Sequence, residues 1–554
     1  MILLALSDAH KSFGARAVLQ GVDLGVHDRS RTGLIGPNGG GKSTVLRILA
    51  GLESPDNGAP VRRRDLTTAY LPQLVTADSR TPLQIGLDAR PEIARAERSL
   101  ETCASQLSDP AVYSDPDTLG RVLRRQERLL AELDRLDAHA FAGRVRGHLS
   151  SLGVDEEEMT RSQSDLSGGT RKLVALAACL AAEPDVLLLD EPETHLDAAR
   201  RSRLEELLRQ FQGAVVMVSH DRYLLDESVS HIAELDRGRV RMFAGNYSTY
   251  QAERQLQLQR QADVFHAQRR EIERLQEAIR RYKQWASMVD DPQHATRARN
   301  TQRRIDRMDT VERPVLERRR MALALRGAAR GGKRVVELRA ATVDMGGRTI
   351  LRRVDLSVHR GERIGVIGVN GAGKSVLAGM LVGNVQPTSG ERWIGPSIRI
   401  GHLRQEHDPP PPGATPIDLL RAQRPCTEAD AVHALIGFLF SYEQCRQPVA
   451  AMSSGERTRL ELLQLMRSEA NCLVLDEPTN HLDVDAVEAL EDAIEAYDGT
   501  VVLVSHDRYL LDRICDRIVE VADQRAEAYE GGYSTWYVRR RSAAGSAVTS
   551  DRRR

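Results

Sequence analysis

Two short segments of the sequence have the residue types and the spacing of a phosphate-binding loop. Both match GxxxxGK[ST], and each follows a strand-like run and precedes a helix-like run, which is the context that this pattern requires. In such a loop the glycines let backbone N–H groups close around phosphate oxygens, and the following helix N-terminus adds a favourable dipole. The predicted nucleotide-binding residues are Gly36, Pro37, Asn38, Gly39, Gly40, Gly41, Lys42, Ser43 and Thr44, and Gly368, Val369, Asn370, Gly371, Ala372, Gly373, Lys374, Ser375 and Val376.

The last residues of each loop indicate a nucleoside triphosphate bound together with Mg²⁺. Lys42 and Lys374 have the position of the lysine that pairs with the β- and γ-phosphates. Ser43 and Ser375 have the position of the hydroxyl that binds Mg²⁺. The predicted cofactors are therefore ATP and Mg²⁺.

Two further apolar runs, VLLLDE and CLVLDE, end in an Asp-Glu pair and predict the rest of the chemistry. We expect buried parallel strands, whose carboxyl ends are where open α/β sheets place their ligands. Asp190 and Asp476 would hold Mg²⁺, and Glu191 and Glu477 would orient and polarise the attacking water. The pairs could instead cap the next helix, but adjacent carboxylates repel each other unless a cation lies nearby. The sequence thus predicts ATP hydrolysis at two sites.

The paired motifs belong to an internal repeat that covers most of the chain. The phosphate loops, and the LPQ and LRQ segments after them, are related by an offset of 332 residues. From the LSGG segment onward the offset is 286, so the first copy carries 46 additional residues between Gln73 and Leu166. This places the same machinery twice in one polypeptide.

The elements that position these residues define an α/β fold class with two P-loop cassettes in tandem. We predict the first cassette at residues 1–250, a helical arm inserted within about 86–150, and the second cassette at 334–537. A basic helical linker occupies 251–333, and residues 538–554 form a disordered basic tail. An a/d-like stripe and the interruption DDPQH predict two antiparallel linker helices. The stripe consists of Phe265, Ile272, Leu275, Ile279 and Tyr282, then Ala298, Ile305 and Met308.

Composition excludes several classes of protein. The six cysteines are scattered without a CxxC pair, which argues against a disulfide framework, a zinc ribbon or an iron–sulfur cluster and is typical of a reducing cytosol. The first residues, MILLALSDAH, lack the basic region of a signal peptide. No apolar run approaches the roughly 18 residues that a membrane span needs. We therefore expect a cytoplasmic protein.

The motifs resemble those of the ABC-F family, which comprises soluble tandem ATP-binding cassettes joined by a helical linker. LSGGT at 166–170 and MSSGE at 452–456 are similar to the signature sequence of ATP-binding cassette proteins, and DEPTNHLD at 476–483 is especially like this subfamily. HLD at 195–197 and 481–483 resembles the D-loop. The resemblance implies catalytic and Mg²⁺-binding roles for the Q-loop glutamines Gln73 and Gln405, and catalytic roles for the switch histidines His220 and His506.

The resemblance also implies that the cassettes meet head to tail within one monomer, each ATP lying between one P-loop and the other copy's signature. Site one, with the first P-loop, would close against Ser453, Ser454 and Gly455. Site two, with the second P-loop, would close against Ser167, Gly168 and Gly169. A Ser-Gly-Gly turn that opens a helix is itself suited to bind an anion.

The sequence departs from the family pattern at three places. Ser454 replaces the usual first glycine of the second signature, and Glu193 and Thr194 interrupt the first DEPTNHLD-like segment. Phe13 fits the aromatic residue that stacks on adenine, but Met345 occupies the equivalent position 332 residues later. The two sites are therefore predicted to differ.

ABC-F proteins bind the ribosome at the tRNA exit site, so the resemblance predicts rRNA and tRNA as partners, with the linker directed towards the peptidyl-tRNA. Residues 251–330 hold 19 basic and 11 acidic residues, a net charge of +8, although the whole chain is neutral. Arginines beside the aromatic residues Tyr282 and Trp285 suit RNA backbone and unstacked bases. The alternative is a solvated coiled-coil face with many ion pairs. The candidate RNA-binding residues are Arg297, Arg299, Arg303 and Arg304.

Other functions remain open from the sequence. Within the family, a general translation factor and an antibiotic-resistance protein are both compatible, and the short DDPQH tip favours the former. An ATPase subunit that recruits membrane subunits in trans would have no use for the basic linker. No DNA partner is expected, because the long coiled coils and zinc modules of DNA-repair ATPases are absent from the sequence.

Overall fold

The computed structural model describes residues 1–14, 16–109, 112, 114–194, 196–288, 292–308, 332–404, 410–438, 440–468, 470–479, 482 and 484–540. These residues belong to two compact units. The first comprises Met1–Tyr247, Leu325–Pro410 and Met452–Arg554, and the second comprises Ser248–Ala324 and Pro411–Ala451. Both P-loops, both signatures and both Asp-Glu pairs lie in the first unit.

The first copy of the repeat contains two sheets. Its strands are β1 (Ile2–Phe13), β2 (Arg16–His27), β3 (Arg31–Ile35), β4 (Asn57–Arg62), β5 (Thr68–Leu71), β6 (Val186–Asp190), β7 (Ala214–Val218), β8 (His231–Asp236) and β9 (Arg239–Ala244). An antiparallel sheet has the order β2-β1-β4, and a larger sheet has the order β5-β6-β7-β3-β8-β9. In the larger sheet β8 and β9 pair antiparallel, and the other neighbours pair parallel.

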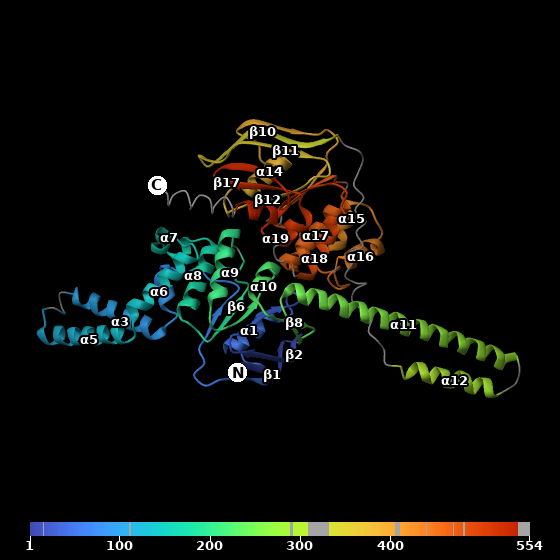
Figure 1. The fold of residues 1–554 in the computed structure, drawn as a ribbon, viewed down its shortest axis with the longest axis horizontal. Helices are drawn as coiled ribbons and strands as arrows, with labels where there is room; N and C mark the ends of the chain where they lie inside the picture. Colours follow the sequence, from blue (N-terminus) through green and yellow to red (C-terminus); the bar gives the residue numbers. More distant parts are fainter. Residues whose placement is uncertain are drawn as a thin grey trace. The chain divides into compact units, whose positions relative to one another are not determined.

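The helices of the first copy follow the strands that carry the motifs. They are α1 (Lys42–Ala50), α2 (Pro82–Leu87), α3 (Pro91–Leu107), α5 (Pro116–Arg135), α6 (Ala138–Ser151), α7 (Glu156–Thr160), the short 3₁₀ turn η1 (Gln163–Asp165), α8 (Gly168–Ala181), α9 (Ala198–Gln210) and α10 (Arg222–Ser228). In the segment for which we predicted a helical arm, α3 and α5 lie side by side (Figure 1). Their buried residues are Ile93, Ala94, Ala96 and Cys103 of α3 and Val122 and Leu133 of α5.

The second copy repeats the same topology. Its strands and helices in the first unit are β10 (Arg334–Met345), β11 (Arg348–His359), β12 (Arg363–Gly368), α14 (Lys374–Val382), β13 (Ser389–Ile394), β14 (Ile400–Leu403), α17 (Ser454–Arg467), β15 (Cys472–Asp476), α18 (Val484–Glu495), β16 (Thr500–Val504), α19 (Arg508–Ile514), β17 (Arg517–Ala522) and β18 (Arg525–Glu530). The sheet orders are β11-β10-β13 and β14-β15-β16-β12-β17-β18, which match the first copy strand for strand. The prediction of two tandem α/β cassettes is thus confirmed.

Each cassette has its core between its two sheets, around the helix that follows the P-loop. Every residue of β6, β7, β15 and β16 is buried, as expected for central parallel strands with apolar sequences. In the first cassette, Val45, Leu46 and Ile48 of α1 belong to one buried cluster with residues from both sheets. Leu377 and Leu381 of α14 occupy the same place in the second cassette. The core therefore fixes each P-loop helix against the sheet that carries the acidic pair.

The second unit is helical. It contains most of α11 (Tyr247–Met288), together with α12 (Pro292–Asp306), α15 (Pro416–Gln423), α16 (Glu428–Gly437) and the 3₁₀ turn η2 (Val449–Ala451). Figure 1 shows α12 returning alongside α11, and an ion pair of 3.3 Å joins Arg304 of α12 to Glu271 of α11. From the predicted stripe, Leu275 and Ile279 are buried. Of the predicted tip at 290–294, residues 292–294 begin α12, and residues 290 and 291 lie outside the described residues. Of the predicted disordered tail, residues 538–540 are helical, and the rest lies outside the described residues.

Within the described part of the chain, no helix has both the length and the apolar composition needed to cross a membrane.

Candidate functional site

The two P-loops have nearly identical backbones, and both require glycine. The loops connect β3 to α1 and β12 to α14. A Cβ atom on Gly36 would lie 2.3 Å from the carbonyl oxygen of Leu235, and a Cβ atom on Gly368 would lie 2.3 Å from that of Val521. Because a side chain is excluded at this position in both copies, the loop backbone can approach a ligand and the strand behind it closely.

The lysines of both loops fold back over the loop that carries them. Lys42 Nζ donates to the carbonyl oxygen of Gly36 at 2.8 Å, and Lys374 Nζ donates to that of Gly368 at 2.9 Å. Both side chains are buried, and burial lowers the pKa of Lys374. An ammonium group at this place can exchange carbonyl oxygens for phosphate oxygens without moving out of the loop.

The aspartates of the two acidic pairs are suited to a hard divalent cation. Asp190 and Asp476 are buried, and each accepts a hydrogen bond from the P-loop serine of its own cassette, Ser43 or Ser375. The Oδ1 atom of each aspartate is buried and has no hydrogen-bond partner among the described residues. Burial raises the pKa of both carboxyl groups. Unpaired carboxylate oxygens beside a hydroxyl form the oxygen donor set that Mg²⁺ prefers, so these residues fit the predicted metal.

The glutamates after these aspartates adopt a strained backbone in both cassettes. Glu191 has φ of 48° and Glu477 has φ of 49°, in the left-handed region that residues other than glycine rarely adopt. Their N–H groups donate to Val218 at 2.9 Å and to Val504 at 2.8 Å, which fixes the turn. Strain of this kind persists where the surrounding structure holds a functional side chain in place.

The predicted catalytic residues of site one converge on Glu191. Gln73 Nε2 donates to Glu191 Oε1 at 2.9 Å, and His220 Nε2 lies 3.7 Å from the same oxygen. Thr194, one of the departures from the family pattern, donates its hydroxyl to Glu191 Oε2 at 3.2 Å. The structure therefore brings the predicted glutamine, acid and histidine of the first cassette together.

In site two the histidine contacts the P-loop directly. His506 Nε2 lies 3.1 Å from Lys374 Nζ, 3.1 Å from Asn370 Oδ1 and 3.5 Å from Glu477 Oε1. Burial, with a contribution from Lys374, lowers the pKa of His506 well below its ordinary value, so the imidazole is neutral at neutral pH. Burial raises the pKa of Glu477 to about 7. Gln405 lies outside the described residues, as do His195 and His481 of the D-loop segments.

The two signatures begin their helices in the same way but differ in the bonds of the serine. Ser167 caps α8 and accepts from the N–H of Thr170 at 3.1 Å. Ser453 caps α17, and its hydroxyl donates to the Glu456 carboxylate at 2.9 Å. Ser454 is the first residue of α17 and has no left-handed backbone, so the serine at this glycine position fits without strain. The pairing of each signature with the opposite P-loop stays a prediction.

Phe13 and Met345 occupy equivalent places at the ends of β1 and β10. Phe13 pairs with Arg16 in the hairpin of the first cassette, and Met345 pairs with Arg348 in that of the second. Their exposed fractions are 49% and 48%, so both side chains are accessible to a nucleotide base.

We predict that site one binds nucleotide more tightly and that site two cleaves the γ-phosphate faster. Losing an aromatic stack costs on the order of 1 kcal/mol, which is several-fold in affinity. Met345→Tyr should therefore tighten ATP binding only when site two is intact, as measured by titration with a fluorescent ATP analogue. Glu477→Gln should lower turnover more than Glu191→Gln, because site one is predicted to close against Ser453, whose hydroxyl already donates to Glu456. Equal losses from the two glutamine variants would contradict the asymmetry.

Sequence reasoning missed a buried lysine of the first cassette. Lys172 of α8 donates to the carbonyl oxygens of Gln73 at 2.8 Å and Asp190 at 2.9 Å. It therefore ties the signature helix to the Q-loop and to the strand that ends in the acidic pair. The equivalent residue of the second cassette is Thr458. This difference between the copies is the sequence feature that could have pointed to Lys172.

Sequence reasoning also missed a set of pseudo-symmetric contacts between the cassettes. Arg222 Nη1 donates to Glu491 Oε2 at 3.0 Å, and Arg508 Nη1 lies 3.1 Å from Glu205 Oε1. Both arginines and both glutamates are buried. The two arginines are 286 residues apart, as are the two glutamates. Each cassette therefore contributes one arginine and one glutamate to the two ion pairs. The arginines belong to the SHDRYLLD segments and lie two residues after the switch histidines.

Comparison with known proteins matches a family described as ABC transporter at residues 19–194 and 351–480, and an extension with the same description at residues 233–324. The chain is 34% identical to the uncharacterized ABC transporter ATP-binding protein YfmR of Bacillus subtilis, over 97% of this chain and 84% of that protein. It is 31% identical to the energy-dependent translational throttle protein EttA of Escherichia coli, over 97% of this chain and 95% of that protein.

Two further matches bear on family and fold. The chain is 30% identical to ABC transporter F family member 5 of Arabidopsis thaliana, over 96% of this chain and 76% of that protein. Among solved structures, it resembles an archaeal ribosome recycling factor, aABCE1, solved in complex with the ribosomal stalk protein aP1. The TM-score is 0.61 with 19% identity, over 97% of this chain and 92% of that one, which is a likeness of fold.

Proposed function

The chain belongs to the ABC-F family of tandem ATP-binding cassette proteins, and on this premise we propose that it binds and hydrolyses ATP in order to act on the ribosome during translation. The observation that carries the proposal is the match, over nearly the full length of both proteins, to a protein named as an energy-dependent translational throttle. The two nucleotide sites would provide energy by hydrolysing ATP, and the basic linker would contact RNA.

In the proposed reaction each P-loop binds the triphosphate through backbone N–H groups and its lysine. Ser43 with Asp190, and Ser375 with Asp476, would hold Mg²⁺, which would supply positive charge beside the β- and γ-phosphates. Glu191 and Glu477 orient the attacking water, and the high pKa of Glu477 suits it to accept a proton near neutral pH. The neutral His506 beside Lys374 and Glu477 can hydrogen-bond the water or the γ-phosphate.

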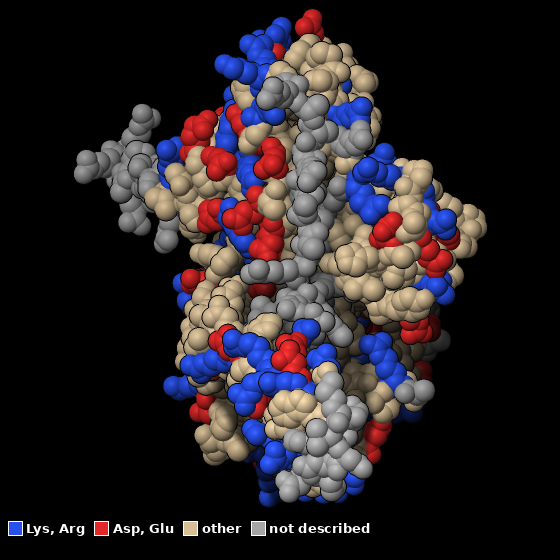
Figure 2. Space-filling view, turned by 90° about the vertical axis from the view of Figure 1, so that its right-hand side faces the viewer, with Lys and Arg blue, Asp and Glu red and all other residues tan. Residues whose placement is uncertain are grey.

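The linker surface supports contact with RNA. Arg297, Arg299 and Arg303 of α12 are exposed, and no ion pair joins them to an acidic residue in the described part of the chain. Arg304 differs, because it pairs with Glu271 of α11. Figure 2 shows Lys and Arg side chains gathered over the lower part of the face that it draws. Unpaired guanidinium groups are the ones available to phosphates.

We propose further that the protein occupies the tRNA exit site with its linker directed towards the peptidyl-tRNA, as in the family that it belongs to. A long helix such as α11, with 42 residues, can span about 60 Å, which suits a reach between distant ribosomal features. The protein would act as a monomer, since one chain supplies both cassettes.

Replacing Arg297, Arg299 and Arg303 by Ala should weaken binding to purified ribosomes about tenfold at physiological salt. The slope of log affinity against log salt should fall by roughly two to three, because each lost phosphate contact releases one counterion fewer. Binding is measured by co-sedimentation across a salt series. ATP hydrolysis without ribosomes should stay unchanged.

The matched control removes three exposed arginines from α11, Arg260, Arg269 and Arg270, and should leave the salt slope close to the wild-type value. If the α12 variant binds ribosomes as tightly as the control does, the basic surface of α12 is only a solvated face and the RNA role is refuted.

A further inference from the structure

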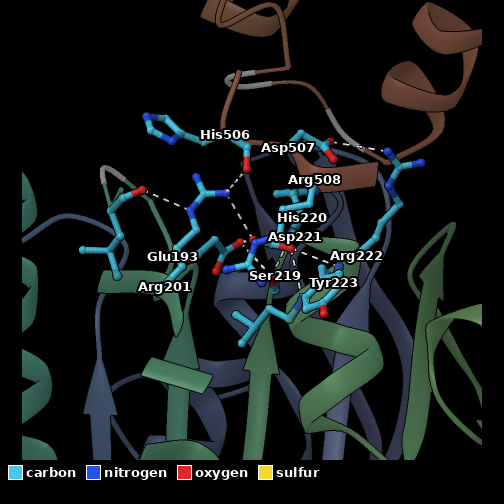
Figure 3. Close-up of polar contacts among 12 residues, drawn as sticks. Glu193, Arg201, Ser219, His220, Asp221, Arg222, Tyr223, His506, Asp507 and Arg508 are labelled. Carbon is cyan, nitrogen blue, oxygen red and sulfur yellow. Dashed lines mark hydrogen bonds and ion pairs between the residues drawn. The ribbon is translucent and has the colours of Figure 1, made fainter. Parts of the chain in front are cut away.

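The two switch loops are joined by a chain of polar contacts that begins in the first cassette and ends at the histidine of the second. Figure 3 shows Glu193 and Asp221 on one side of Arg201 and the backbone of His506 on the other. Arg201 Nη1 donates to Asp221 Oδ2 at 3.2 Å and to the carbonyl oxygen of His506 at 3.1 Å. One guanidinium group therefore binds the residue after one switch histidine and the backbone of the other switch histidine.

Glu193 anchors the first-cassette end of this chain. Its Oε1 atom accepts from the hydroxyl of Ser219 at 2.7 Å and from the N–H groups of His220 at 3.0 Å and Asp221 at 3.4 Å. The side chain is buried, and its Oε2 atom has no hydrogen-bond partner among the described residues. A buried carboxyl group with one oxygen unpaired is costly, so its retention here indicates a purpose other than stability.

The second cassette lacks both members of the chain. The residues 286 positions after Glu193 and Arg201 are Thr479 and Val487. Threonine is too short to reach a loop as Glu193 does, and the buried Val487 cannot donate a hydrogen bond. The connection is therefore asymmetric. Residues of the first cassette bind the switch loop of the second, and the equivalent residues of the second cassette cannot make the same bonds to the first.

The chain of polar contacts ends at His506, beside the P-loop and the catalytic acid of site two. The ring of His506 contacts Lys374, Asn370 and Glu477, so a shift of its backbone would move the imidazole relative to the P-loop and the catalytic acid. Arg201 thus acts on the position of the His506 ring relative to Lys374 and Glu477.

We infer that Glu193 and Arg201 are positioning residues for γ-phosphate cleavage at site two, through which the switch loop of the first cassette sets the place of His506. This inference rests on the proposed ATPase function. It makes site two dependent on the state of the first cassette, whereas site one does not depend on the equivalent positions of the second.

The test separates the two sites by using backgrounds in which only one can hydrolyse. In the Glu191→Gln background only site two is active, and Arg201→Val, which copies the second cassette, should lower single-turnover cleavage of ATP about tenfold. In the Glu477→Gln background only site one is active, and the same change should alter cleavage by less than about twofold. ATP affinity should stay within about twofold in both, since the P-loops are untouched.

Conservative variants distinguish positioning from general packing. Arg201→Lys should restore part of the lost cleavage, because an ammonium group can still donate to the His506 carbonyl oxygen. Glu193→Thr should reproduce the site-two defect, and Glu193→Gln, which keeps the accepting oxygen, should largely avoid it. Arg209→Val, at an exposed position of the same helix α9, should leave both backgrounds unchanged.

Equal losses in the two backgrounds, or a loss of ATP affinity that matches the loss of cleavage, would overturn the inference and leave Arg201 with a purely structural role. An Arg201→Val protein that cleaves ATP normally in both backgrounds would overturn it as well. Failure of the wild-type chain to hydrolyse ATP at all would instead refute the proposed function, so the two failures are distinguishable.

Discussion

A chain carrying both Glu191→Gln and Glu477→Gln is expected to bind ATP with wild-type affinity and to hydrolyse it at least ~100-fold more slowly. The amide keeps the size of each side chain, and it keeps an oxygen that can accept the hydrogen bond from Gln73 to Glu191. It cannot accept a proton from water, and the P-loops that bind the nucleotide are unchanged. Release of phosphate at saturating ATP, with a parallel binding titration, measures both quantities.

The matched control changes two exposed glutamates outside the sites, Glu206 and Glu530, to Gln and should hydrolyse ATP at the wild-type rate. If the double variant at 191 and 477 keeps more than about a tenth of the wild-type turnover, these glutamates do not orient the water, and another group must be found.

Removing Arg222 should cause a large loss of stability at the contacts between the cassettes. Arg222→Met leaves the buried Glu491 without its closest counter-charge, which costs about 3 kcal/mol for a broken buried pair. Arg513, 3.0 Å from the same carboxylate, limits the loss. We expect the midpoint of thermal unfolding to fall by roughly 3–6 °C.

A double-mutant cycle shows whether the loss comes from the ion pair. Adding Glu491→Gln to Arg222→Met should recover part of the stability, because the uncompensated charge is then gone. The exposed pair Arg446–Glu428 supplies the comparison, and Arg446→Met should cost less than about 1 kcal/mol. Equal shifts for Arg222→Met and Arg446→Met would contradict a role for the buried pair in holding the cassettes together.

The nucleotide machinery could be predicted from sequence because each part of it is local. A P-loop needs its glycines, lysine and serine within eight residues, and the acidic pairs end apolar runs such as VLLLDE that can only be buried strands. The internal repeat adds a second copy of each motif at a fixed offset, and the structure gives the two cassettes matching strand orders.

The contacts between cassettes could not be predicted in this way, since they depend on how α9, α10, α18 and α19 are placed in space. The residues that form them, such as Arg201 and Glu491, look like ordinary charges on amphipathic helices. The left-handed backbone of Glu191 and Glu477 could not be predicted either, because glutamate does not favour that conformation. Comparing the copies position by position exposes part of this information, as the pairs Arg201–Val487 and Glu193–Thr479 illustrate.

The consequence of Ser454 for the second signature could not be predicted from the sequence either. A serine at a glycine position suggests strain, yet residue 454 adopts ordinary helical geometry as the first residue of α17. The difference between the two signatures lies instead in the capping bonds of Ser453 and Glu456.

On the proposed function, ATP binding by this chain controls its action on the ribosome. The most direct test is sedimentation of the Glu191→Gln, Glu477→Gln variant with a cell extract over sucrose gradients, with ATP, with ADP and without nucleotide. We expect the variant to move with ribosomes in the presence of ATP and to stay at the top of the gradient with ADP, because on the proposed function only ATP would hold the cassettes closed when cleavage is blocked. Sedimentation that is the same with ATP and ADP, or association with DNA or membranes in place of ribosomes, would contradict the account.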